Sequence, residues 1–151
     1  MLLTVKINDQ EYQEEIAAGE FLIDFLRRLG YKSVKRGCET SNCGACSVLV
    51  NGKVVLSCSS LAASVNGKEI KTLEGLQEET DILGAFIAEE GADQCGYCTP
   101  GFMMAAIALK REIPNPSEDE IKAYLAGNLC RCTGYMGQLR AIKKYLEVSK
   151  C

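Results

Sequence analysis

Short segments in the first half of the chain alternate hydrophobic and polar residues, which is the pattern of β-strands with one buried face. These strand-like segments are residues 3–7, 12–16, 47–50, 53–56 and 69–72. Asn51-Gly52 separates the third segment from the fourth and predicts a tight hairpin. Hydrophobic residues at helical spacing over 21–29, followed by Gly30, predict one helix. Together these elements fit a small mixed sheet wrapped around a helix, the β-grasp ferredoxin arrangement.

In the second half, hydrophobic residues recur at helical spacing from about Thr80 onward. The predicted helices cover residues 81–90, 100–109, 117–126 and 139–146. Thr80 is the expected cap of the first helix, and Pro100 suits the first turn of the second. Ser117 and Glu120 form a capping box for the third. Four short helices predict a compact bundle.

The change of pattern predicts an α+β chain of two domains, residues 1–76 and residues 77–151, joined by a hinge over 73–79. Each half is small enough that its hydrophobic core alone would give marginal stability. Bound metal would supply part of the missing folding free energy.

Eight of the nine cysteines form two ordered groups of four, and the first group has a diagnostic spacing. It consists of Cys38, Cys43, Cys46 and Cys58. The first three form C-x4-C-x2-C, as in plant-type [2Fe–2S] ferredoxins. Gly44 and Ala45 lie between the ligands, where small residues let backbone N–H groups approach the sulfurs. The spacing favours an iron–sulfur cluster, with a four-cysteine zinc site as the alternative.

The spacing of the second group is less specific for one kind of centre. This group consists of Cys95, Cys98, Cys130 and Cys132, as C-x2-C followed by C-x-C. A second iron–sulfur cluster, a zinc site and a thioredoxin-like redox pair are all compatible with this spacing, although the βαβ pattern that accompanies the redox pair is missing. We expect Cys98 and Cys132 to begin helices, where free N–H groups stabilise an anionic cluster.

Composition and charge limit the partners, the location and the kinds of site to be expected. A net charge of −3 with interspersed charges gives no reason to expect nucleic acid or a membrane as a partner. Without a signal sequence or an apolar run of membrane length, a cytoplasmic protein is expected rather than a secreted disulfide scaffold. The absence of histidine excludes a Rieske centre, a His-containing zinc finger and a Ser-His-Asp triad. Cys151 is expected to be a leftover thiol.

Three segments around the cysteines resemble the iron–sulfur subunit of the xanthine dehydrogenase family, the molybdenum hydroxylases. They are GCETSNCGACSVLVNG at 37–52, QCGYCTPGFMM at 94–104 and GNLCRCTGY at 127–135. The likeness covers essentially the whole chain and all eight grouped cysteines. It implies an N-terminal β-grasp, plant-type ferredoxin-like domain and a C-terminal four-helix domain, each holding one [2Fe–2S] cluster on its own four cysteines. Ser41 stands where many members carry glycine.

The resemblance also implies a function without a catalytic residue on this chain. The chain would be the electron-transfer subunit of a molybdenum-dependent oxidoreductase acting on a purine, an N-heterocycle or an aldehyde. Expected partners are a large subunit with a molybdenum–pterin cofactor and a medium FAD subunit, in a dimer of heterotrimers. Gln94 would hydrogen-bond the pterin, and Cys132 would lie on the electron path from it. The rival interpretations are a free two-cluster ferredoxin and a structural zinc module.

Overall fold

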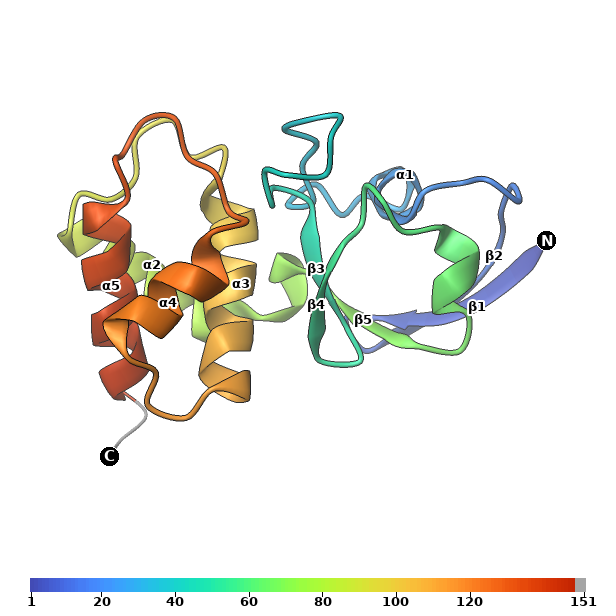
Figure 1. Cartoon of the computed structure of the whole chain (residues 1–151). Coiled ribbons are helices and arrows are strands. Elements are labelled where there is room, and N and C mark those ends of the chain that lie inside the picture. Colours follow the sequence, from blue (N-terminus) through green and yellow to red (C-terminus); the bar gives the residue numbers. More distant parts are fainter. Residues whose placement is uncertain (149–151) are drawn as a thin grey trace.

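The two sequence patterns become a sheet and a helical bundle, placed side by side (Figure 1). The computed structural model describes residues 1–148, so Cys151 lies outside the described residues. The strands are β1 (Leu2–Ile7), β2 (Gln10–Glu15), β3 (Ser47–Val50), β4 (Lys53–Leu56) and β5 (Glu69–Lys71). The helices are α1 (Leu22–Arg28), α2 (Gln77–Glu89), α3 (Thr99–Glu112), α4 (Glu118–Leu125) and α5 (Met136–Glu147), with short 3-10 turns η1 (Ala62–Val65) and η2 (Leu73–Gly75).

The five strands form one mixed sheet in the order β2-β1-β5-β3-β4. β1 and β5 are parallel, and the other neighbouring pairs are antiparallel. Alternation along β1 buries Leu3, Val5 and Ile7 in one hydrophobic core with Phe25 of α1. The Asn51-Gly52 turn joins β3 and β4 as predicted, with both residues at positive φ. The β-grasp expectation is confirmed.

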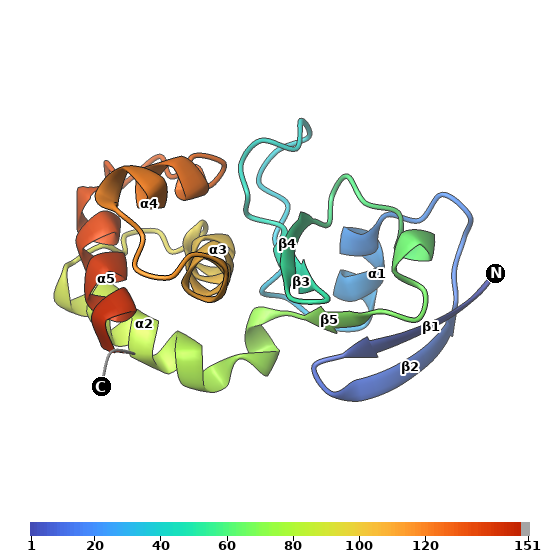
Figure 2. The same cartoon turned by 60° about the horizontal axis from the view of Figure 1, so that its bottom comes forward.

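Helix α3 lies between the sheet and the other helices of the bundle (Figures 1 and 2). Its residues from Gly101 to Leu109 are all buried, because one side faces β3 and the other faces the bundle. Small residues such as Ala105 and Ala106 allow this close packing on both sides. Leu49 of β3 belongs to the same hydrophobic core as the bundle, so that core continues into the sheet.

The backbones of the two halves meet closely at two glycines. A Cβ on Gly101 would overlap the carbonyl oxygen of Gly44, and a Cβ on Gly44 would overlap the Asn128 side chain and the Gly127 carbonyl oxygen. Asn128 is buried and donates from Nδ2 to the carbonyl oxygens of Gly101, at 3.2 Å, and Gly44, at 3.5 Å. Glycine is therefore required on both sides of this contact.

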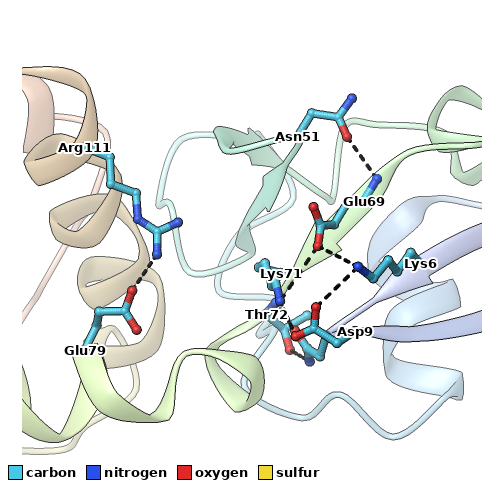
Figure 3. Close-up of polar contacts among 9 residues, drawn as sticks. Lys6, Asp9, Asn51, Glu69, Lys71, Thr72, Glu79 and Arg111 are labelled. Carbon is cyan, nitrogen blue, oxygen red and sulfur yellow. Dashed lines mark hydrogen bonds and ion pairs between the residues drawn. The ribbon is translucent and has the colours of Figure 1, made fainter.

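Polar contacts fix the segment that leaves the sheet for the bundle (Figure 3). The Asn8 side chain donates to the Thr72 hydroxyl and accepts from the Thr72 N–H. Glu74 accepts from the N–H and hydroxyl of Ser33 and from the hydroxyl of Thr72. Further along, Arg111 of α3 pairs with Glu79 of α2. The expected hinge over 73–79 is thus held by side-chain contacts.

The bundle has the predicted four helices, although several of their ends differ from the prediction by three or four residues. Ser117 and Glu120 form the predicted capping box of α4. The prediction that Thr80 caps the first helix of the bundle is wrong, because that helix, α2, already begins at Gln77. The Thr80 hydroxyl instead donates to the carbonyl oxygen of Gln77, 2.9 Å away. Leu76 is buried and precedes the helix without a side-chain cap, so the propensity of Thr80 for a cap position does not decide where the helix starts.

The glycine contact gives a paired prediction. Gly101→Ala should destabilise the protein by about 1–3 kcal/mol, since the added methyl group must push two backbones apart. Gly84→Ala is the control: its Cβ would meet only Met103 Cε at 3.5 Å, and alanine in a helix should stabilise by about 0.5–1 kcal/mol. Guanidinium unfolding of the cluster-loaded protein measures both. Equal stabilities for the two variants would contradict the close contact.

Candidate metal centres

The hairpin places Cys58 beside the three-cysteine loop. Ser47 at the start of β3 pairs with Leu56 at the end of β4, so the residues just outside this pair face one another. The N–H and the hydroxyl of Ser57 both donate to the carbonyl oxygen of Cys46, at 3.3 and 2.7 Å. The thiol of Cys58 consequently contacts that of Cys46.

The first group of thiols stands as two contacting pairs, Cys38 with Cys43 and Cys46 with Cys58. Gly37 borders the first pair, and a Cβ there would lie 3.1 Å from the Cys43 sulfur. Within residues 1–148, no three side chains of the metal-ligating types are placed to hold a single metal ion. Two pairs of thiols match a two-iron centre, in which each iron takes two protein ligands.

Backbone N–H groups supply the positive electrostatic field that clustered thiolates need. Hydrogen bonds from the backbone of Thr40, Asn42 and Cys43 lower the pKa of Cys38 to about 6. Burial raises the pKa of Cys46 to about 11, so at neutral pH this thiol stays protonated unless a bound metal displaces its proton. The loop therefore suits a metal centre better than a free thiolate.

Ser41 lies in this loop with a left-handed backbone, at φ 58°. That conformation costs an ordinary side chain energy and costs glycine little, which explains why glycine suits the position. The Ser41 hydroxyl lies 3.5 Å from the Cys58 sulfur. The serine thus places one extra polar hydrogen next to a cysteine of the first group.

The second group is assembled from two loops of the bundle, which run side by side (Figure 1). Cys95 and Cys98 precede α3, and Cys130 and Cys132 lie between α4 and α5. These thiols also form contacting pairs. The sulfurs of Cys95 and Cys132 are 3.7 Å apart at the exposed edge, and Cys98 contacts Cys130 on the more buried side.

Only one of the two cysteines expected at a helix start is found there. Cys98 immediately precedes α3, as predicted. The prediction for Cys132 is wrong, because α5 begins only at Met136. Gly134 and Tyr135 both have positive φ and turn the chain between Cys132 and the helix. A helix N-terminus therefore borders one side of the second group only.

Three polar side chains around the second group were not anticipated from the sequence. The Tyr135 hydroxyl accepts from the Cys130 N–H at 2.9 Å, and the Thr133 hydroxyl lies 3.1 Å from the Cys130 sulfur. Gln138, 2 % exposed, directs its amide toward Cys98. Gln138 precedes Leu139 in the apolar stripe of its helix. A polar residue in such a stripe is the sequence signal that could have indicated a contact with the thiols.

Both groups of thiols face one cavity of about 420 Å³ between the two halves. Cys38 and Cys43 line it from one side, and all four cysteines of the second group line it from the other. Tyr97 bridges the halves there: its hydroxyl donates to the Arg36 carbonyl oxygen at 2.9 Å. The fold therefore brings together two thiol groups that are far apart in the sequence.

Two known domain families match the chain. The "2Fe-2S iron-sulfur cluster binding domain" matches residues 5–80, and the "[2Fe-2S] binding domain" matches residues 72–143. The xanthine dehydrogenase iron-sulfur-binding subunit of Escherichia coli is 46% identical over 136 residues, covering 85% of this chain and 84% of the relative. The nicotinate dehydrogenase small FeS subunit of Eubacterium barkeri is 44% identical over 133 residues, covering 86% and 83%.

The chain belongs to the family of iron–sulfur subunits of the xanthine dehydrogenase-type molybdenum hydroxylases. Solved structures agree. A chain of quinoline 2-oxidoreductase from Pseudomonas putida 86 superposes with a TM-score of 0.91 at 36% identity, covering 99% of this chain and 95% of that one. Aldehyde oxidoreductase from Desulfovibrio gigas gives 0.92 at 35% identity, covering 99% of this chain and 17% of that one.

As a family member, the protein is the electron-transfer subunit of a molybdenum-dependent oxidoreductase and has two [2Fe–2S] clusters. The paired thiols, the directed N–H groups and the space next to Gly37 fit such clusters. Gln94 and Cys132, the residues predicted to face the pterin cofactor, are both exposed at the outer edge of the second group. Each cluster, when bound, supplies reversible one-electron chemistry.

Two substitutions of Ser41 distinguish the effect of backbone strain on stability from the effect of the hydroxyl group on the reduction potential. Ser41→Gly should be more stable than Ser41→Ala by about 1 kcal/mol, because only glycine relieves the left-handed backbone. Both variants lose the hydroxyl beside Cys58, and both should therefore lower the reduction potential of the N-terminal cluster to the same extent. Chemical unfolding measures the first effect, and EPR-monitored redox titration measures the second. Equal stability of the two variants would contradict the backbone argument.

Proposed function

We propose that each half of the subunit holds one [2Fe–2S] cluster on its own thiols. The N-terminal ligands are Cys38, Cys43, Cys46 and Cys58, and the C-terminal ligands are Cys95, Cys98, Cys130 and Cys132. The pairing of the thiols assigns two of them to each iron, as Cys38/Cys43, Cys46/Cys58, Cys95/Cys132 and Cys98/Cys130. The single observation that carries this proposal is that the eight thiols pair only within their own half of the chain.

We infer that the subunit carries electrons from a large molybdenum–pterin subunit to a medium FAD subunit. The side that suits contact with the pterin is the outer edge of the second group. Cys95 and Cys132 are exposed there, and Gln94 is adjacent. Gln94 would hydrogen-bond the cofactor there, and Cys132 would be the first ligand on the electron path. The exposed loop residues Glu39, Thr40 and Asn42 suit the FAD side.

The domain division and the assembly belong to the same proposal. The two family matches overlap over residues 72–80, which supports domains of 1–76 and 77–151. Relatives act on xanthine, nicotinate and aldehydes, which supports a complex that oxidises a purine, an N-heterocycle or an aldehyde. We propose a dimer of heterotrimers in the cytoplasm, without nucleic acid or membrane partners. Among residues 1–148, no helix has the length and hydropathy to cross a bilayer.

Metal analysis tests the two-cluster proposal directly. Purified subunit should contain four irons and four acid-labile sulfides per chain, and the dithionite-reduced protein should show two S = 1/2 EPR signals. Two irons with one signal and stoichiometric zinc would leave the N-terminal assignment intact and refute the C-terminal one.

Single cysteine variants test the assignment of ligands. Cys58→Ser should abolish or shift the N-terminal EPR signal while the C-terminal signal persists, because a serine oxygen is a poorer iron ligand than a thiolate, and Cys130→Ser should do the opposite. Cys151→Ser is the matched control, since Cys151 belongs to neither group, and it should retain both signals. If Cys151→Ser loses a signal, or if Cys58→Ser keeps both signals unchanged, the ligand sets are wrong.

A further inference from the structure

Gln138 is a buried polar residue whose side chain faces the second thiol group. It is the third residue of α5 and is 2 % exposed. Its Nε2 lies 3.7 Å from the sulfur of Cys98, and its Oε1 lies 3.0 Å from the hydroxyl oxygen of Thr133. The same hydroxyl oxygen is 3.1 Å from the sulfur of Cys130. One amide and one hydroxyl thus contact both thiols of the buried pair.

The orientation of the Gln138 amide follows from its two neighbours. A thiolate at Cys98 accepts hydrogen bonds and donates none, so the nitrogen end of the amide must face it. The oxygen end then faces the Thr133 hydroxyl, which can donate. The reversed amide would place a carbonyl oxygen against a thiolate. The Thr133 oxygen also accepts from the Tyr135 N–H at 3.3 Å, which holds the hydroxyl in place.

Packing alone does not call for an amide at this position. Gln138 is flanked along α5 by the apolar stripe of Leu139, Ala141 and Ile142, all buried. A hydrophobic side chain would fill the same space, whereas a buried amide carries a desolvation cost that only satisfied hydrogen bonds offset. The satisfied partners of Gln138 are Thr133 and the thiol of Cys98.

We propose that Gln138 is a positioning residue of the C-terminal cluster and raises its reduction potential. The inference rests on the proposed ligation by Cys98 and Cys130. Reduction adds one negative charge to the cluster and its thiolates, and an N–H donor at Cys98 stabilises that charge. The Thr133 hydroxyl has a single hydrogen, which it donates either to Gln138 Oε1, where it orients the amide, or to the Cys130 sulfur, where it acts on the ligand directly. The other pair, Cys95 and Cys132, lies at the exposed edge of the group.

Replacement of the amide by a thioether tests the proposal. Gln138→Met keeps an unbranched side chain of similar length and removes the N–H donor. We expect the midpoint potential of the C-terminal cluster to fall by about 59 mV, which is a tenfold change in the reduced-to-oxidised ratio of a one-electron couple. EPR-monitored redox titration of the full chain measures this shift, and the N-terminal cluster of the same molecule, whose potential should not change, is an internal reference.

A neighbouring substitution controls for packing. Leu139→Met introduces the same side chain at the next position of α5 and removes no donor, so the C-terminal potential should stay at the wild-type value. Iron analysis separates the two proposals. Wild-type protein with only two irons refutes the ligand assignment, whereas four irons with an unchanged potential in Gln138→Met refutes the role of Gln138.

A second pair of variants tests the proposal if Gln138→Met loses the C-terminal cluster. Thr133→Val removes the hydroxyl that orients the amide and contacts the Cys130 sulfur, and Thr133→Ser retains it. A lower C-terminal potential in Thr133→Val, restored in Thr133→Ser, supports the polar network. Equal potentials in these two variants overturn it.

Discussion

The whole arrangement depends on the approach of two backbones at Gly44 and Gly101. One glycine belongs to the first cysteine loop and the other to the first turn of α3, shortly after Cys98. Any side chain at either position would separate the halves, and the Asn128 amide closes the contact by hydrogen bonding to both carbonyl oxygens. Because this contact lies beside cysteines of both groups, it determines how closely the two clusters can approach.

The two halves solve the same electrostatic problem in different ways. Clustered thiolates carry negative charge that burial makes costly, so each group needs hydrogen-bond donors. In the first group, backbone N–H groups of a tight loop provide them, as at Cys38. In the second group, the backbone N–H groups of Cys132 and Thr133 donate to Cys130, and the side chains of Thr133 and Gln138 add further donors. The backbone donors of both groups depend on loop conformation, whereas the side-chain donors depend on residue identity and are open to adjustment by substitution.

Much of the fold was predictable from local pattern. The Asn51-Gly52 hairpin and the Ser117–Glu120 capping box are short-range features whose residues specify their own geometry. The failures concern boundaries that distant contacts decide. Helix α2 starts at Gln77 rather than after Thr80, and the turn at Gly134 and Tyr135 separates Cys132 from α5. The segment that joins the two halves is held by Asn8 and Ser33, which are distant in the sequence.

The sequence by itself narrowed the chemistry of this protein to all-cysteine centres, because cysteine spacing within a short loop limits which metal centres can bind, and the absence of histidine excludes the histidine-containing ones. Only the tertiary structure decided which thiols pair, that both groups share one cavity, and that Gln138 faces Cys98. These are contacts between segments separated by up to about a hundred residues. They depend on how helices and strands pack, which no local pattern of hydrophobic and polar residues specifies.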